Sequence, residues 1–388
     1  MLLPVPTPAL PPTQPRLASL DVFRGLTIAA MVIVNNPGSW DHVYSPLDHA
    51  EWNGCTPTDL IFPFFLFIVG ASMGLSKSKP ATSRVWFRML RRAGTLFALG
   101  LMLNASSMLV RREIDWSHLR FMGVLQRIAL CYAAAFALTR VLRATGQVAF
   151  GATLLLGHAA LLRWASTPGY EPGTLTPDGN FSGWIDRLTI GTDHIYKHGP
   201  MDPEGLLGTL TATVTVLMGY WTVLIARRRS TDGASVTGHR LGMIVSLGGA
   251  CVLAGWMWEN AAGLPINKQL WTGSYVLFTG GCAMISLALC MVVIDRWNWR
   301  RLGRPLEVLG MNAILLFVGS GLGARVLAAT RVGEVDGKPV TLARWIYDQA
   351  CVPVAGPLNG SLLFATATLA FWWMVLYPCW RRRWFWKI

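Results

Sequence analysis

Charged residues are scarce in this chain of 388 residues. Asp, Glu, Lys and Arg together make up 14% of it, whereas 53% is hydrophobic and the mean hydropathy is +0.41. This composition is not that of a soluble domain of similar size. Acidic residues are the scarcer sign, with 20 against 34 Lys and Arg, so the net charge is +14. The chain is therefore expected to meet lipid over most of its surface.

Several chemical motifs are also missing. The seven Cys form no CxxC pair and no metal-ligand spacing, and most lie in apolar runs, where Cys behaves as a small hydrophobic residue. No P-loop, GxSxG or GxGxxG motif occurs in the context that its chemistry requires. Nucleotide hydrolysis, an α/β-hydrolase and a metal centre therefore have no support in the sequence.

Apolar runs of about 20 residues dominate what is present. We predict that ten of them cross a membrane as α-helices, because backbone groups in hydrocarbon must be hydrogen-bonded within the segment. Their approximate bounds are 20–38, 56–76, 93–110, 120–142, 147–165, 205–226, 241–259, 270–295, 305–328 and 358–380. The sequence thus predicts an all-α polytopic bundle that forms a single domain over residues 17–388. The Pro-rich residues 1–16 are predicted to be a disordered tail and not a cleaved signal peptide.

Basic residues fall mainly in alternate loops. They occupy both terminal segments, the short connection at Arg140 and Arg143, and the loops 77–92, 226–240 and 295–304. By the positive-inside rule these segments, and both termini, are cytoplasmic. The net charge is then explained by topology and lipid, and we predict no nucleic-acid partner.

Most acidic residues fall on the opposite, outer side. The outer loop 166–204 is rich in Gly, Pro and Asp and is predicted to form an ordered lid. The segment 341–351 is predicted to be a short helix at the membrane interface.

The densest polar cluster lies between the first two predicted spans, in the stretch NNPGSWDHVYSPLDHAEWNGCTPTDL. Polar groups packed against membrane spans are costly and commonly functional. His49 is of the type that shuttles protons near neutral pH, although a surface His in a wet loop, or a role for His42 instead, also fits the pattern. Asp59 either favours the first turn of span two or orients His49. Asn35, near Pro37, either marks a helix end or donates its amide to a carbonyl oxygen.

Other polar groups lie inside or beside later spans. Arg127, next to Gln126, is a charge within span four that needs a partner, for which Asp21 and a phosphate are the two candidates. The spacing of two His and several acids in the 166–204 loop matches no metal site, so an acceptor-binding surface is predicted there.

Seven blocks of the sequence together resemble the heparan-α-glucosaminide N-acetyltransferase family. They occur in the family's order over about residues 17–388: LDVFRGLTIAAMVIVNN, HAEWNGCTPTDLIFPFFLFIVG, LRFMGVLQRIALCY, GWIDRLTIGTDHIYKH, DPEGLLGTL, GLPINKQLWTGSYVL and LGMNAILLFVG. The resemblance implies a transmembrane acetyltransferase. Acetyl-CoA would enter from the cytoplasm, and the acetyl group would reach the amine of a glucosamine-type amino sugar on the outer side. It maps the family's active histidine to His49 and not to His42, and its asparagine to Asn35.

These considerations together predict three sets of site residues and no metal. The catalytic set is His49 as general base, Asn35 and Asp59. The set that contacts acetyl-CoA is Gln126, Arg127, Lys268, Trp271 and Asn312. The set that contacts the acceptor is Trp52, Asn53, Asp186, His194, Asp202 and Glu204.

The chain is expected to lack the lumenal N-terminal domain and extra leading span of the animal enzyme, and so to resemble the shorter bacterial members. That resemblance implies a homodimer, a multi-pass location in the inner membrane, and periplasmic outer loops. An amino-sugar transporter and an O-acetyltransferase of envelope polysaccharide are the alternative interpretations.

Overall fold

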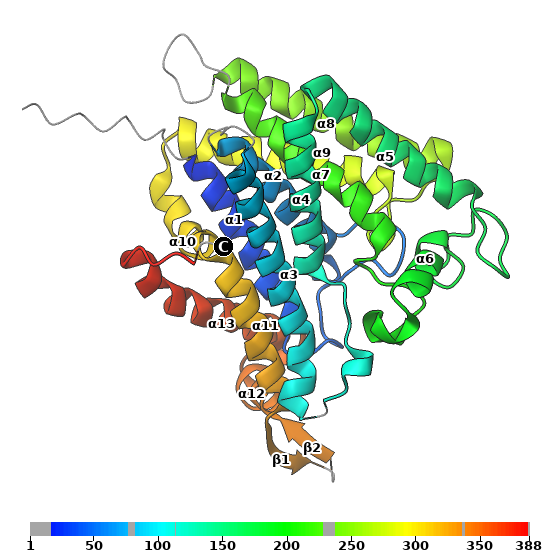
Figure 1. The fold of residues 1–388 in the computed structure, drawn as a ribbon. Helices are drawn as coiled ribbons and strands as arrows, with labels where there is room; N and C mark the ends of the chain where they lie inside the picture. The colour runs from blue at the N-terminus through cyan, green and yellow to red at the C-terminus, as the bar shows by residue number, and fades with distance from the viewer. Residues whose placement is uncertain (1–16, 77–81, 113, 228–236, 336–337, 387–388) are drawn as a thin grey trace, which may run out of the picture.

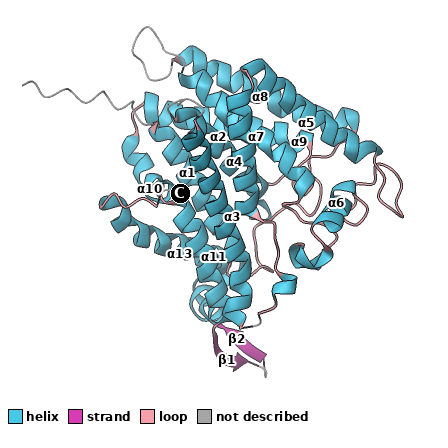
Figure 2. Cartoon of the chain, in the orientation of Figure 1, coloured by secondary structure: helices cyan, strands magenta, loops and turns pink. Residues whose placement is uncertain are grey.

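A computed structural model describes residues 17–76, 82–112, 114–227, 237–335 and 338–386, most of which are helical (Figures 1 and 2). The helices in chain order are α1 (Ala18–Asn35), α2 (Ile61–Leu75), α3 (Ser83–Arg111), α4 (Val124–Val141), α5 (Ala144–Trp164), α6 (Phe181–Thr189), α7 (Leu206–Arg227), α8 (Gly238–Ala262), α9 (Gly273–Cys290), α10 (Arg300–Met311), α11 (Ala313–Ala329), α12 (Leu342–Ile346) and α13 (Val352–Arg381). The strands β1 (Arg331–Val335) and β2 (Lys338–Thr341) form an antiparallel hairpin, the one sheet of the described ranges. The predicted tail 1–16 lies outside the described residues.

Nine of the ten predicted spans are found as helices that, within the described ranges, are long and apolar enough to cross a membrane. The remaining one corresponds to α10 and α11, a pair bent by 66° that counts as a tenth span if the two helices cross together. The prediction of an all-α polytopic bundle is therefore confirmed. Continuity of the ninth span was predicted wrongly, because α10 ends at Met311 and α11 begins at Ala313. The predicted interface helix 341–351 is not separate either. It runs as α12 and a π-helical turn into α13, which kinks at Gly356 (φ +76°).

Helix α7 lies at the centre of the bundle and packs against α2, α4, α5 and α9. Its contact with α2 is close, since a Cβ at Gly70 would overlap the Val216 carbonyl and one at Gly219 would overlap the Phe67 carbonyl. Small residues at both crossing points allow two helix backbones to approach in this way. Helix α2 is consequently held at a defined position against α7.

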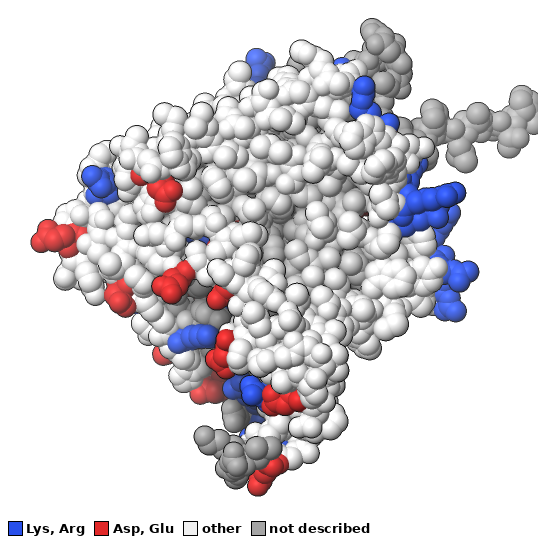
Figure 3. All heavy atoms as spheres, turned by 180° about the vertical axis from the view of Figure 1, so that it is seen from behind, with Lys and Arg blue, Asp and Glu red and all other residues white. Residues whose placement is uncertain are grey.

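Charged side chains are separated along the molecule. On the face shown in Figure 3, most Lys and Arg gather toward one end and most Asp and Glu toward the other, with an uncharged band between them. This agrees with the charge pattern read from the sequence. The assignment of the basic end to the cytoplasm remains a prediction.

The segment 166–204 packs beside one end of the bundle. It contains α6 and two short 3₁₀ turns, Thr192–His194 and Tyr196–His198, and leads directly into α7 (Figure 1). The Asn180 side chain caps α6 by accepting a hydrogen bond from the Gly183 amide at 2.6 Å. We call this segment the lid.

Candidate active site

The carboxylate of Asp59 is buried at the start of α2. It lies in the 3₁₀ turn Pro57–Leu60 that precedes the helix, and its side chain is only 2% exposed. Its Oδ2 accepts hydrogen bonds from the amides of Ala50 (3.0 Å) and Thr56 (3.1 Å) and from the Thr56 hydroxyl (3.1 Å). This is a capping box, so Asp59 does favour the helix start, as one of the two interpretations of the sequence held.

The other oxygen of Asp59 meets His49. Asp59 Oδ1 lies 2.7 Å from His49 Nδ1, and Lys268 Nζ lies 3.1 Å from that oxygen and 3.0 Å from Nδ1. His49 is 47% exposed and Lys268 is 24% exposed, so the group opens to solvent on the histidine side. An ionised carboxylate accepts the Nδ1 proton, and the tautomer that results leaves the lone pair of Nε2 free. We call His49, Asp59 and Lys268 the His–Asp–Lys cluster.

Asn267 brings Lys268 to this cluster. It is fully buried, and its amide donates to the Trp52 carbonyl (2.9 Å) and to the Asn53 side chain (3.1 Å). Its Oδ1 accepts from the Leu270 amide at 2.8 Å. The loop that carries His49 is thereby joined to the turn that carries Lys268. Asn267 was missed in the sequence, where its place beside Lys268 was the one available signal.

An aromatic floor lies under the cluster. Trp271 is fully buried, with its ring edge-on to Phe62 (5.0 Å) and to Tyr275 (5.1 Å). The Tyr275 hydroxyl donates to the backbone carbonyl of Asp59 at 2.7 Å. Tyr275 was also missed, although it lies four residues after Trp271 in the same block, GLPINKQLWTGSYVL.

The interior charge predicted in span four is found, but its predicted ion-pair partner is wrong. Arg127 is fully buried and donates to the Thr209 hydroxyl (3.2 Å) and the Gly205 carbonyl (3.1 Å). Asp21 instead pairs with Arg24 at 2.9 Å. Gln126 is buried as well and donates to the Phe121 carbonyl at 3.1 Å.

The remaining loop residues separate into two groups. Trp52 donates to the Leu175 carbonyl in the lid at 2.9 Å, beside Asn53. Asn35 is exposed at the end of α1, and its side chain makes no hydrogen bond within the described part of the chain. His42 turns toward the π-helical turn Tyr347–Cys351 that precedes α13, and its Nδ1 lies 3.4 Å from the Tyr347 hydroxyl.

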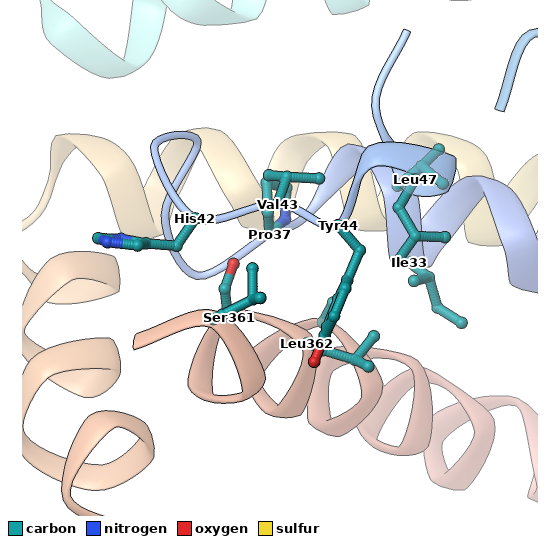
Figure 4. Close-up of a pocket in the computed structure, with 11 residues that line it drawn as sticks. Ile33, Pro37, His42, Val43, Tyr44, Leu47, Ser361 and Leu362 are labelled. Carbon is teal, nitrogen blue, oxygen red and sulfur yellow. The ribbon is translucent and has the colours of Figure 1, made fainter. Parts of the chain in front are cut away.

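Figure 4 shows how the loop before His49 rests on α13. Tyr44 reaches down to α13 and donates to the Asn359 side chain, while His42 points away from Tyr44. The backbone of Ser39 exchanges two hydrogen bonds of 3.1 Å with the Ser361 hydroxyl. The two histidines of this loop therefore have different surroundings, and only His49 belongs to the His–Asp–Lys cluster.

Two of the predicted acceptor-binding acids are engaged inside the lid. Asp202 is buried and accepts two hydrogen bonds from Arg120, at 2.9 and 2.6 Å, and Glu204 pairs with the same guanidinium. These ion pairs raise the pKa of Arg120 against the opposing effect of its burial. The His194 ring stacks on Phe121 and bonds the Leu119 carbonyl at 2.7 Å. The lid carboxylates therefore tie the lid to the segment before α4.

Asp186 is the third buried acid of the lid. Its Oδ1 accepts from the Leu206 amide at 2.9 Å, whereas Oδ2 has no partner among the described residues. Burial raises the pKa of this carboxyl from 3.8 to about 6, and the nearby Asp202 carboxylate adds to the rise. The folded state therefore holds the proton more tightly than the unfolded state.

A pH dependence of stability follows from Asp186. Because its pKa is raised on folding, the free energy of unfolding falls as pH rises from about 4 to about 6, by about 3 kcal/mol for this group, and stays lower above that range. Asp186→Asn is expected to remove this part of the slope. Thermal unfolding of both proteins in detergent between pH 4 and 8 measures the difference. Parallel Tm–pH curves for the two proteins would contradict it.

A largely apolar cavity of about 380 Å³ lies between α1, α2, α3, α4 and α11. Arg24 and Arg92 line it, together with Phe65, Leu96 and Ile128. Phe65 lies in the second turn of α2, six residues after Asp59. The helix that follows the His–Asp–Lys cluster thus also lines the cavity.

Two groups at this cavity bear on ligand binding. The Arg92 guanidinium lies over the Tyr132 ring at 4.9 Å, and its buried Nε has no hydrogen-bond partner among the described residues. Asn312 holds the chain end that includes the lining residue Trp386, because it donates to the Trp384 carbonyl (3.1 Å) and accepts from the Trp386 amide (3.0 Å). None of the residues predicted to contact acetyl-CoA lines the cavity. Asn312 lies between the lining residues Met311 and Ala313, and Gln126 and Arg127 lie between Leu125 and Ile128.

The fold and the site together define a polytopic helical membrane protein with a His–Asp–Lys cluster at one end of its bundle. Residues 16–182 match the family model for the catalytic region of heparan-α-glucosaminide N-acetyltransferase. Human heparan-α-glucosaminide N-acetyltransferase is 30% identical over 364 residues, which is 80% of this chain and 53% of that protein. The mouse protein of the same name is 28% identical over 358 residues, or 78% and 53%. The chain belongs to this family, and it spans about half the length of the curated relatives it matches.

Proposed function

We propose that this protein transfers the acetyl group of acetyl-CoA to the amine of a glucosamine-type amino sugar. Membership of the family supports this activity. The observation that supports assigning the activity to particular residues is the 2.7 Å contact between His49 Nδ1 and Asp59 Oδ1. Amide formation needs a base for the ammonium proton, and a neutral imidazole with a free Nε2 is suited to that task.

The proposed reaction is a direct transfer. His49 Nε2 takes a proton from the acceptor ammonium, and the neutral amine attacks the thioester carbonyl carbon. The carbon–sulfur bond then breaks, and CoA leaves as the thiolate. The nitrogen gives up its second proton to that thiolate, directly or through water, and His49 releases the first proton to solvent. Asp59 holds the imidazole in the required tautomer. Lys268 neutralises the Asp59 carboxylate through their 3.1 Å contact and adds positive charge beside the reacting carbonyl. The exposed amide of Asn35 is proposed to donate to the carbonyl oxygen.

We propose that acetyl-CoA uses the cavity beside α2. Its apolar walls suit the pantetheine arm, and Arg24 and Arg92 supply positive charge for the phosphates. Both arginines lie in the half of the bundle predicted to face the cytoplasm, so the acetyl group would travel along α2 toward Asp59. The acceptor would then meet it from the predicted outer side, under the lid.

The function is tested with purified protein in detergent, acetyl-CoA and glucosamine. N-acetylglucosamine is the expected product, measured by mass spectrometry with no gradient present. An amino-sugar transporter would instead move labelled glucosamine into proteoliposomes without acetyl-CoA and would form no product in detergent. Acetylation of a sugar hydroxyl with the amine left free would contradict the proposed acceptor group.

Arg92→Leu is expected to raise the KM for acetyl-CoA by about 10-fold or more, because a charge-assisted contact to a phosphate is lost. The change in kcat should stay within about twofold, since Arg92 is remote from the reacting atoms. Steady-state kinetics measure both constants. Arg88→Leu, one turn earlier on α3 and exposed, is the matched control. With acetyl-pantetheine, which carries no phosphates, wild type and Arg92→Leu should have equal KM, and a persistent difference would contradict the phosphate contact.

A further inference from the structure

The strained backbone of Trp271 marks a second structural element beneath the cluster. Its φ of +52° is rare for a bulky residue and persists only where the surroundings enforce it. Its carbonyl accepts from the Thr211 hydroxyl at 2.7 Å, and its ring meets Phe62 and Tyr275 at their edges. The face of the ring is covered by the Arg127 guanidinium at 4.8 Å.

Trp271 is joined to two residues of the cluster, Lys268 and Asp59. The Trp271 amide donates to the Lys268 carbonyl at 3.2 Å, so the two residues close one turn. Phe62 follows Asp59 by three residues, and Tyr275 bonds the Asp59 carbonyl. A shift of the Trp271 ring would therefore move Lys268 relative to Asp59.

Arg127 joins the same ring to the end of the lid. Its Nη2 and Nε bond the Gly205 carbonyl and the Thr209 hydroxyl at the start of α7, immediately after the lid acids Asp202 and Glu204. A buried cation is costly, and Arg127 Nη1 has no partner among the described residues. The buried guanidinium of Arg127 is not needed to hold the start of α7, because the Thr209 hydroxyl itself donates to the Gly205 carbonyl at 2.8 Å.

We propose that Arg127 and Trp271 are positioning residues for the His–Asp–Lys cluster. The cation over the indole face holds Trp271 in its strained conformation, which sets Lys268 against Asp59 and His49 and fixes this geometry to the end of the lid. This role rests on the proposed function, and it replaces the contact with acetyl-CoA that the sequence predicted for both residues.

The test compares Trp271→Phe and Arg127→Met with two matched controls. Trp221→Phe changes a partly buried Trp that bonds Gln147 on the far side of α7. Arg325→Met changes another partly buried span arginine with a hydroxyl and a carbonyl partner, Ser107 and Gly321. Each site variant is expected to lower kcat by about 10- to 100-fold, because small misplacements of reacting groups are costly, with the KM for acetyl-CoA within about twofold. The controls should stay within about threefold of wild type in both constants.

A second readout does not depend on turnover. The rate at which diethyl pyrocarbonate modifies His49, mapped by mass spectrometry, should change at least about threefold in both site variants and not in the controls. Arg127→Lys keeps a cation near the indole and should recover part of both effects, and it replaces Arg127→Met if that variant does not fold as judged by gel filtration. A raised KM with unchanged kcat, or unchanged labelling in the folded site variants, would overturn the positioning role. If wild type makes no product while labelling of His49 still changes as expected, the proposed function fails and the positioning role stands.

Discussion

His49→Ala is expected to lower kcat/KM for acetyl transfer by about 10²–10⁴-fold, the range typical of a lost general base. Asp59 and Lys268 would remain 3.1 Å apart in the variant, so the fold around the site has no reason to collapse. The measurement is the initial rate of N-acetylglucosamine formation. A residual rate should remain, because binding and orientation of the two substrates do not depend on the imidazole.

His42→Ala is the matched control for this variant. It removes a histidine from the same loop, but one that points away from Tyr44 (Figure 4) and whose ring lies beside the Tyr347 hydroxyl. We expect turnover within about threefold of wild type. Turnover in His49→Ala at the wild-type level would remove His49 from the mechanism, whatever the control does.

Acid quenching tests whether the transfer is direct. Wild-type protein is incubated with labelled acetyl-CoA alone and then denatured in acid. Direct transfer predicts no label on the protein. Label that is present in wild type and absent from His49→Ala would instead show that the imidazole holds the acetyl group.

Asp59→Asn is expected to have an effect nearly as large as that of His49→Ala. The asparagine carbonyl can still accept from Ala50 and Thr56, but its amide would then donate to His49 Nδ1. The imidazole would be forced into the other tautomer, with the proton on Nε2 and no lone pair for the acceptor amine. A change of this kind lowers kcat by about 10⁴-fold in a serine protease. We therefore expect a fall of about 10²–10⁴-fold in kcat.

Separate measurements of KM and kcat, together with a control variant, distinguish the change of tautomer from a loss of structure. The KM for acetyl-CoA should stay within about threefold, because Asp59 does not line the cavity. Asp41→Asn, an exposed change in the same loop, should leave both constants unchanged. If Asp59→Asn has a lower Tm, and its kcat returns to the wild-type value when both proteins are assayed at a lower temperature, Asp59 acts through stability alone.

Local sequence was a good guide to two of the three residues of the cluster. His49 and Asp59 are ten residues apart on either side of a helix start, so the capping pattern and the spacing already favoured a contact between them. Lys268 is 219 residues from His49, and no local pattern indicates that contact. It was predicted to bind acetyl-CoA, because a lysine near a span end resembles a phosphate ligand when it is seen without its neighbours.

The polar groups of the interior and the lid were harder to assign. Arg127 and Trp271 were predicted to contact acetyl-CoA, but each has its principal contacts inside the bundle. Asp202 was predicted to contact the acceptor, and it lies buried against Arg120. Residue type and hydropathy indicate that such a group needs a partner. They do not identify the partner.

The sequence by itself determined the class of this protein. Runs of apolar residues define the spans because each helix satisfies its own backbone hydrogen bonds, so hydropathy alone is sufficient evidence. The tertiary structure decided which polar groups meet. The bend at Asn312, the turn at Asn267 and the packing of Trp271 on Phe62 and Tyr275 all depend on contacts between segments distant in the chain. The His–Asp–Lys cluster and the cavity beside it result from that packing, which no single segment encodes.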